Sequence, residues 1–479
     1  MSFKEKIIRN FEIIMPACFF VNIFANVISF YFTANIVNSI RLCISWGIVL
    51  IFNLVASVVF ISILHNCEKK KMLLISIPFI VNLLLIFIAI WDSGFSLFAI
   101  KKLIVFILLC WPIYIIAIYT QKFEILRLMI GNFKWIGLVM IPFFSVCIIT
   151  YFYAKITQIY IVDVGNISYL SIAYAAYLIL IFCVADIWIQ TLKKEADKKI
   201  TLDLLCIIVC SITIIASESR GVLLALIIWY FAMLLAIFIK KKVRKNLIFT
   251  MLLILVTIVA SYSLLTIFNK SESQGRVAAL VQEFKDKDIG TAINTEASDK
   301  IIGIMMESPG LDVFQKIENI DIDKNNENNV ELNEAIKGIT NGSSARVYLY
   351  RIAIEEAKRN WVGGMGPLGY QQKYGTYPHN LILEVLADFG YIIGILFMVS
   401  IFYLVVVVFR CAKYDVRALV LLVIAIGCVV RFMLSIDSYT EPLLIWIITY
   451  AIGLKVFKKD TKCNEETIGE IDIKESYPQ

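Results

Sequence analysis

The chain has 479 residues, of which 60% are hydrophobic, and its mean hydropathy is +0.81. Soluble globular domains are about 45–50% apolar, so this composition excludes a water-soluble protein of this size. The formal net charge of +7 does not indicate nucleic-acid binding, because the lysines and arginines fall in short clusters between apolar runs. We therefore expect a membrane protein with no nucleic-acid partner.

Many apolar stretches are long enough to cross a bilayer, whose core of about 30 Å takes roughly 20 helical residues. The N-terminal stretch lacks a small-residue cleavage site, so we expect a first span there rather than a cleaved signal peptide. The sequence predicts an all-α polytopic integral membrane protein with about twelve transmembrane helices. These are expected at 11–33, 42–64, 72–91, 99–119, 133–153, 168–190, 201–217, 221–240, 246–268, 381–409, 416–434 and 441–457.

The connections between these stretches alternate in charge, which predicts their orientation. One set carries basic clusters such as Glu68–Lys71 and Lys240–Lys245, and the positive-inside rule places it in the cytoplasm together with both termini. The other set, which we expect on the extracytoplasmic side, is nearly free of positive charge. Its exceptions are Lys101, Lys102, Lys155 and Arg220.

A single large polar region interrupts the apolar pattern at 269–378. The chain then divides into nine spans over 1–268, an extracytoplasmic loop domain over 269–378, three spans over 379–457 and a cytoplasmic tail over 458–479. Loops of this length are usually functional or disordered. Its middle is rich in Asn, Asp and Glu and is typical of flexible surface chain.

The two flanks of the polar region have helical spacing. Apolar residues recur with this period in Gln274–Lys287 and in Ser343–Trp361, and Ser343 or Ser344 can cap the second helix. The following "VGGMGPLGY", Val362–Tyr370, contains four glycines and a proline and predicts a turn. A backbone loop that binds phosphate is the alternative for this segment.

The cysteines and histidines give no sign of a metal site. The eleven cysteines lie in apolar runs or on the basic side, and none lies in 269–378, so no disulfide framework or Cys/His cluster is indicated. We expect no metal and no cofactor. Of the two histidines, His65 lies beside a basic cytoplasmic cluster and has no evident role.

His379 lies where the polar region meets the tenth span. Pro378 suits the first turn of a helix, which would put His379 at a helix N-terminus, where the dipole favours a neutral imidazole. A neutral imidazole suits a general base. Asn380, Glu384 and Asp388 follow at four-residue steps on one helix face. The alternative is an interfacial histidine followed by solvated acids.

Three arginines lie on the predicted extracytoplasmic side. Arg220 lies in the tight link "SESRG", where it either caps or snorkels or presents a guanidinium to an anion such as phosphate. Arg346 begins the second helix of the polar region, where it is either a surface residue or an anion ligand. Arg431 lies near the outer end of span eleven and needs a partner, either Asp437, Glu441 or a ligand.

These motifs resemble those of the O-antigen ligase and polymerase superfamily. The resemblance rests on "SRG" at Ser219–Gly221, the arginine of "SSARVYLYRIAIEEAKRNW" and "PHNLILEVLADFGYIIG", and it covers roughly Ile200–Leu454. Family members typically carry a proline before the glycine turn, whereas this chain has Trp361-Val362. The resemblance implies a glycosyltransferase with a GT-C-like membrane fold that uses neither metal nor nucleotide.

The resemblance also implies roles for single residues. Arg220 and Arg346 would hold the pyrophosphate of a glycan linked to undecaprenyl pyrophosphate, and His379 would take the proton of the acceptor hydroxyl. Asn380, Glu384 and Arg431 are candidate supporting residues. The implied location is the bacterial cytoplasmic (inner) membrane, with the active site on the extracytoplasmic side. The expected partners are the lipid-linked oligosaccharide, membrane lipid and a chain-length regulator protein.

Three functions fit this pattern. A polymerase of O-antigen or capsular polysaccharide is favoured, because "YPHNLILEVLADFGYIIG" closely resembles the corresponding segment of such polymerases. The second is a ligase that moves finished glycan to lipid A-core, as part of lipopolysaccharide synthesis. The third is a transporter or flippase of lipid-linked sugars, which the sequence favours least because it shows no internal repeat and few charges in its spans.

Overall fold

The structure is a computed structural model that describes residues 3–24, 38–64, 69–157, 163–164, 167–192, 200–239, 244–268, 343–374, 376–412, 415–434 and 439–456. The described chain is helical apart from one short hairpin. In that hairpin, β1 (Asp163–Val164) pairs antiparallel with β2 (Ile167–Ser168), with Asp163 opposite Ser168. The prediction of an all-α protein is therefore confirmed for these residues.

A described helix lies at each predicted span. In the first part of the chain these are α1 (Phe3–Ile23), α3 (Asn38–Leu64), α4 (Lys69–Asp92), α5 (Leu97–Tyr119), α6 (Phe123–Thr157), α7 (Tyr169–Leu192), α8 (Ile200–Ala216), α9 (Arg220–Ile239) and α10 (Arg244–Phe268). Two helices of the polar region follow, α15 (Ser343–Arg359) and α16 (Gly369–Tyr374). The last three are α17 (Leu381–Cys411), α18 (Val416–Leu434) and α19 (Pro442–Val456).

Seven of the described helices are long and apolar enough to cross a membrane, namely α4, α5, α6, α7, α10, α17 and α18. Shorter apolar helices lie at the five other predicted spans, in α1, α3, α8, α9 and α19. The chain is thus an integral membrane protein, and the count of twelve spans stays a prediction. The largest difference is at the first span, because α1 starts at Phe3 and ends at Ile23, whereas 11–33 was expected.

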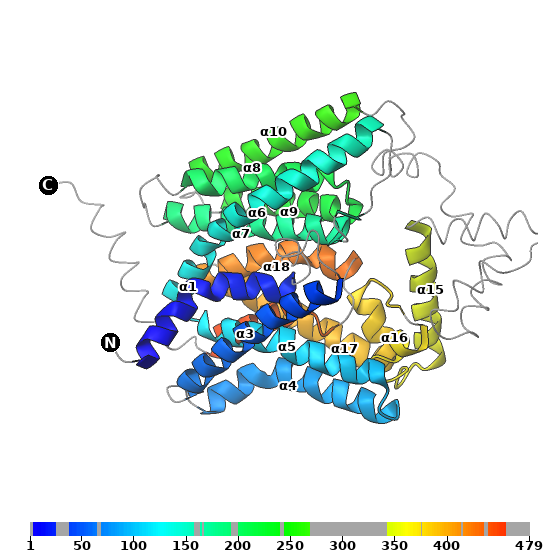
Figure 1. Cartoon of the computed structure of the whole chain (residues 1–479). Helices are drawn as coiled ribbons and strands as arrows, with labels where there is room; N and C mark the ends of the chain where they lie inside the picture. The colour runs from blue at the N-terminus through cyan, green and yellow to red at the C-terminus, as the bar shows by residue number, and fades with distance from the viewer. Residues whose placement is uncertain are drawn as a thin grey trace, which may run out of the picture.

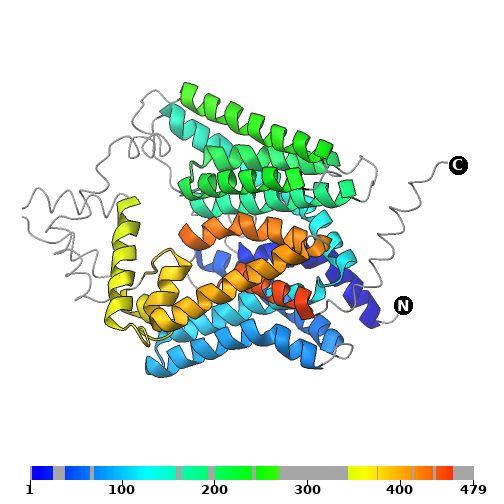
Figure 2. The same cartoon turned by 180° about the vertical axis from the view of Figure 1, so that it is seen from behind.

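The helices form two groups with a layer between them (Figures 1 and 2). One group runs from α6 to α10, the other contains α3, α4, α5 and α17, and α1 and α18 lie between them (Figure 1). α7 is buried along its whole apolar window, because α6, α8, α9 and α18 all pack on it. Many outer helices instead expose large apolar side chains, such as Ile149, Val256 and Phe402, as expected of surfaces that face lipid tails.

α15 and α16 lie at one end of the bundle, opposite the end at which α1 begins (Figure 1). α15 packs on α17, and its Tyr350 hydroxyl donates a hydrogen bond to the Met433 carbonyl near the end of α18 (3.5 Å). This end therefore carries α15, which contains Arg346, and the start of α17, which His379 precedes. The domain division itself stays a prediction, since 269–342 and 457–479, with the helix expected at Gln274–Lys287, lie outside the described residues.

Candidate functional site

His379 and Asn380 form the entry to α17. The helix begins at Leu381, and the Asn380 side chain caps it by accepting hydrogen bonds from the amides of Ile382 (3.0 Å) and Leu383 (3.1 Å). The expectation that Pro378 occupies the first helical turn is therefore wrong, because an asparagine cap starts the helix three residues later. His379 is half-buried just outside the cap, with its ring 4.2 Å from that of Tyr377.

The backbone of His379 has φ +55°, in the left-handed region that few non-glycine residues occupy. Such a conformation costs about 1–3 kcal/mol and persists only where the surrounding structure fixes it. The asparagine cap on one side and the Tyr377 ring on the other fix it here. The position of the imidazole at the mouth of α17 is therefore set by the chain around it.

Glu384 and Asp388 are fully buried, so the alternative of solvated acids is wrong. The Gln371 amide of α16 donates to Glu384 Oε1 at 2.7 Å. Asp388 accepts hydrogen bonds from the backbone amides of Leu368 (3.0 Å) and Tyr370 (2.9 Å), at the start of α16. Both carboxyl groups thus attach the glycine turn and α16 to the first turns of α17.

α17 is broken at Gly390, which has φ +75° and ψ 178°. The freed carbonyls of Ala387 and Asp388 accept from the amides of Met365 and Gly366, both at 2.9 Å, and the Tyr391 amide donates to the Trp361 carbonyl (2.8 Å). Non-helical backbone within a span is tolerated where protein satisfies it. The glycine turn does so here, which confirms a turn at Val362–Tyr370.

Close packing explains why glycines occupy this turn. A Cβ on Gly390 would lie 2.7 Å from the Trp361 carbonyl oxygen, and one on Gly364 would overlap the Asp388 backbone. The Leu368 amide also meets the Tyr439 hydroxyl (3.0 Å) from the link between α18 and α19. Burial raises the pKa of Tyr439 well above its ordinary value, so this residue stays a neutral hydroxyl.

α15 and α16 are joined by an ion pair at Glu356. Its carboxylate accepts from the Lys373 ammonium (2.8 Å) and the Tyr374 hydroxyl (2.6 Å), and the residue is 2% exposed. Burial alone would raise the pKa of Glu356, but Lys373 and Tyr374 outweigh it and hold that pKa below its ordinary value. The Tyr370 hydroxyl also donates to the Leu349 carbonyl (3.1 Å), so α15 is fixed on α16.

Arg220 is the first residue of α9, directly after the link from α8. Glu218 in that link has φ +49°, and the Leu223 amide donates to the Ser219 carbonyl at 2.9 Å. The Ser219 side chain is buried, and its hydroxyl has no hydrogen-bond partner among the described residues. Arg346 lies in the first turn of α15.

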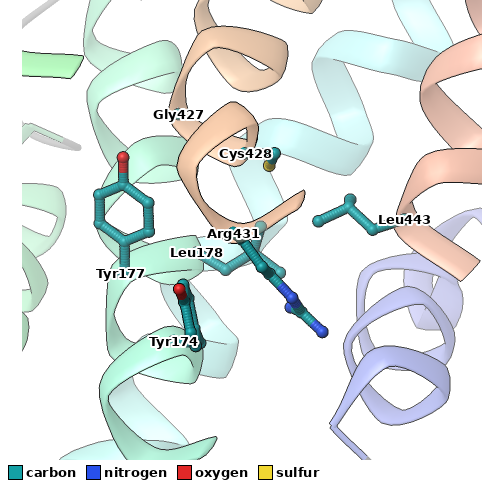
Figure 3. A pocket seen from close by; sticks show the side chains of 7 residues that line it. All are labelled: Tyr174, Tyr177, Leu178, Gly427, Cys428, Arg431 and Leu443. Carbon is teal, nitrogen blue, oxygen red and sulfur yellow. The ribbon is translucent and has the colours of Figure 1, made fainter. Parts of the chain in front are cut away.

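Arg431 is paired near the end of α18. Its guanidinium donates to Glu441 and lies over the rings of Phe24 (5.1 Å) and Tyr174 (5.3 Å). The predicted partner Glu441 is therefore confirmed, and Asp437 lies outside the described residues. Figure 3 shows a small pocket beside Arg431, with roughly the room of one water molecule, lined by Tyr174, Tyr177, Leu178, Gly427, Cys428, Arg431 and Leu443.

Comparison with known proteins identifies the region that holds most of these features. Residues 205–398 match the family described as "O-Antigen ligase". This match confirms the resemblance to the O-antigen ligase and polymerase superfamily. Neither the curated proteins nor the solved structures include a match.

The matched region begins within α8, covers α9, α10, α15 and α16, and ends within α17. It therefore includes Arg220, Arg346, His379, Asn380 and Glu384, whereas Arg431 follows it. The structure bonds Glu384 to Gln371 of α16, whereas the Asn380 side chain caps α17 itself. It stays a prediction that Arg220, Arg346 and His379 contact the same substrate.

Sequence reasoning missed the roles of Asp388 and Gly390. The four-residue spacing predicts only that Asp388 shares a helix face with Asn380 and Glu384. Gly390 lies inside an apolar helical run, and such a glycine is a signal of a break in the helix. The described residues contain no group of three or more His, Cys, Asp or Glu side chains that could hold a metal ion.

Proposed function

We propose that the protein is a glycosyltransferase that polymerises a bacterial surface polysaccharide, an O-antigen or a capsule. It joins repeat units carried on undecaprenyl pyrophosphate at the extracytoplasmic face of the cytoplasmic membrane. The observation that carries the proposal is the O-antigen ligase family match at 205–398, which includes all three residues assigned to the chemistry.

In this proposal the imidazole of His379 takes the proton from an acceptor hydroxyl. The hydroxyl oxygen then attacks the anomeric carbon of the donor, the bond from that carbon to the pyrophosphate oxygen breaks, and the configuration inverts. A half-buried histidine held at the mouth of α17 by the Asn380 cap supports this role. An unprotonated imidazole is required at the start of each cycle.

Arg220 and Arg346 stabilise the pyrophosphate that leaves. Charge grows on this group in the transition state, where fixed cations lower the barrier most. The start of α9 supports the assignment of Arg220, because helix N-termini favour anions and the buried Ser219 hydroxyl beside it is free to donate. With guanidinium groups in this role, the reaction needs neither a metal nor a nucleotide cofactor.

A ligase is the second candidate, because the matching family is described as "O-Antigen ligase". The two functions share the donor and differ in the acceptor, which is a lipid-linked repeat for the polymerase and lipid A-core for the ligase. Purified protein supplied only with lipid-linked repeats distinguishes them. Longer glycans support the polymerase, and a requirement for lipid A-core supports the ligase.

His379→Ala tests the chemistry, with His65→Ala as the matched control because these are the only two histidines. We expect His379→Ala to lower polymer formation at least about 100-fold, the range of general base catalysis, and His65→Ala to leave it unchanged. Cells with His379→Ala should accumulate single lipid-linked repeats on the outer leaflet. Accumulation on the inner leaflet would instead support a transporter, and undiminished polymer would exclude His379 as the base.

A further inference from the structure

A second group of charged side chains lies inside the bundle, at the other end of α8 from Arg220. The Lys134 ammonium of α6 is 2.8 Å from Asp186 Oδ2 of α7 and 3.4 Å from Asp203 Oδ2 of α8. The Gln190 amide donates to Asp186 (2.7 Å) and approaches Asp203 (3.5 Å). Asp203 lies about 20 Å from the end of α8 at 1.5 Å per residue, so this group is separate from the proposed active site.

All four side chains are buried within apolar helices. Lys134 and Asp186 belong to segments that are long and apolar enough to cross a membrane, and Asp203 is 0% exposed. Ionisable residues in such segments are costly and usually mark a site with a partner. A polymerase or ligase reaction at the opposite end of α8 does not require them.

The charges of this group do not balance when both aspartates are ionised. Lys134 supplies one positive charge against two carboxylates, and an unpaired charge is costly in an apolar interior. α10 packs on α7 and α8, and its buried side chains, Leu247, Thr250, Met251, Ile254 and Ser261, are not ionisable. Among the described residues, the thiols of Cys183, Cys206 and Cys210 are the other titratable groups recorded beside the cluster.

The geometry of the Asp186 and Asp203 carboxyl groups indicates what supplies the missing positive charge. Asp186 Oδ2 and Asp203 Oδ2 lie against the same two donors, because Lys134 Nζ and Gln190 Nε2 are each within 3.5 Å of both oxygens. Ionised carboxylates are acceptors only, so a hydrogen bond between them requires a proton on one. Asp186 Oδ2 accepts the shorter bonds from Lys134 and Gln190, as suits a carboxylate, whereas Asp203 Oδ1 has no partner among the described residues.

We propose that α6, α7 and α8 form a buried proton-binding site in which Asp203 carries the proton and Asp186 is ionised beside Lys134. The site is then neutral. The proton on Asp203 joins α8 to Asp186 of α7, and the Lys134 ammonium joins α6 to both aspartates. A glycine allows α6 to approach α8 closely, since a Cβ on Gly137 would lie 2.6 Å from Cys206 Sγ. The ligand of this site is a proton, and it fixes the packing of three helices.

Infrared spectroscopy of the full chain in lipid nanodiscs tests the protonation directly. At neutral pH the wild-type protein should show the carbonyl stretching band of a protonated carboxylic acid, and Asp203→Asn should lose that component. Asp415→Asn, at a carboxylate paired with Arg417, serves as the matched control and should keep the band. An unchanged spectrum for Asp203→Asn, or the same loss of the band in Asp415→Asn, would overturn the assignment.

Thermal unfolding gives an independent test. Asparagine has the shape of a protonated aspartate, so Asp203→Asn should keep the unfolding midpoint within about 2 °C, a shift of under 1 kcal/mol. Lys134→Met should lower the midpoint well beyond this, because it leaves the Asp186 carboxylate buried and unpaired. Two results together would identify a metal cation instead and refute the proton site. These are a wild-type midpoint that rises with sodium concentration and a large fall of the midpoint in Asp203→Asn.

Discussion

At the scale of single residues, the proposed chemistry depends on how the chain holds His379 at the mouth of α17. A positive φ at a histidine is strained, and it is maintained by neighbours whose side chains are themselves fixed. Asn380 does this by capping two amides, so its first role is structural. In the proposed function, Asn380 therefore supports His379 by capping α17.

Asn380→Ala should destabilise the entry to α17 by about 0.5–2 kcal/mol, the usual cost of a lost cap. We expect a lower thermal midpoint together with slower polymer formation, because the histidine loses its support. Asn380→Asp keeps an acceptor for both amides and should restore both properties. If Asn380→Asp had a normal midpoint but the low activity of Asn380→Ala, the amide would instead contact the substrate.

At the scale of elements, α15, α16 and the broken helix α17 form one unit joined by buried carboxyl groups. Asp388 holds the start of α16, Glu384 holds Gln371, and Glu356 joins α15 to α16. Each element alone is short or interrupted, and the bonds between them satisfy the backbone that the Gly390 break leaves open. Arg346 and His379 both lie at the edges of this unit.

The ion pair at Glu356 predicts a pH dependence for this unit. Because its folded pKa is lowered, the pair contributes fully above the ordinary glutamate value, and the contribution is lost as the pH falls through the lowered folded pKa. The midpoint of Glu356→Gln should therefore lie below that of the wild-type protein at pH 7, and the difference should shrink toward about pH 4.

Glu355→Gln is the matched control for this measurement. Glu355 pairs with the exposed side chain of Lys358, and such surface pairs contribute little to stability. Its midpoint should follow that of the wild-type protein at every pH. An equal effect of the two substitutions, or a Glu356→Gln difference that grows on acidification, would contradict the role assigned to the buried pair.

At the scale of the whole molecule, the two ends of the bundle carry different groups of polar residues. α15, α16 and the mouth of α17 lie at one end (Figure 1). The α8 helix runs between the two groups, with Asp203 in its first turn and Arg220 at the start of α9, after the short link that follows α8. The positive-inside rule assigns the first end to the outside and the second to the cytoplasm.

Labelling with a membrane-impermeant maleimide tests this orientation in intact cells. In a chain without the native cysteines, Trp361→Cys should be labelled from outside, because this residue is 59% exposed next to the glycine turn. Glu124→Cys, at a side chain 74% exposed near the start of α6, should be labelled only after the cells are opened. The reverse pattern would place the proposed active site in the cytoplasm and refute the function proposed here.

The sequence by itself determined the membrane class, the helices and their approximate bounds, and the family resemblance that the match at 205–398 supports. These follow from apolar length and from short motifs, both of which depend on neighbours along the chain. For Arg431 it offered Asp437, Glu441 or a ligand as the partner, and the structure shows Glu441.

Only the tertiary structure decided what the buried polar residues do. Asp388 accepts hydrogen bonds from amides 18 and 20 residues away in the chain. α17 is broken at Gly390, where the Tyr391 amide bonds the Trp361 carbonyl. Lys134 contacts acids that are 52 and 69 residues away. A charged residue in an apolar run has a partner set by which helices pack together, and packing depends on contacts between segments distant in the chain. For that reason periodicity predicted where the helices are, whereas their contacts decided which side chains bind, cap or balance charge.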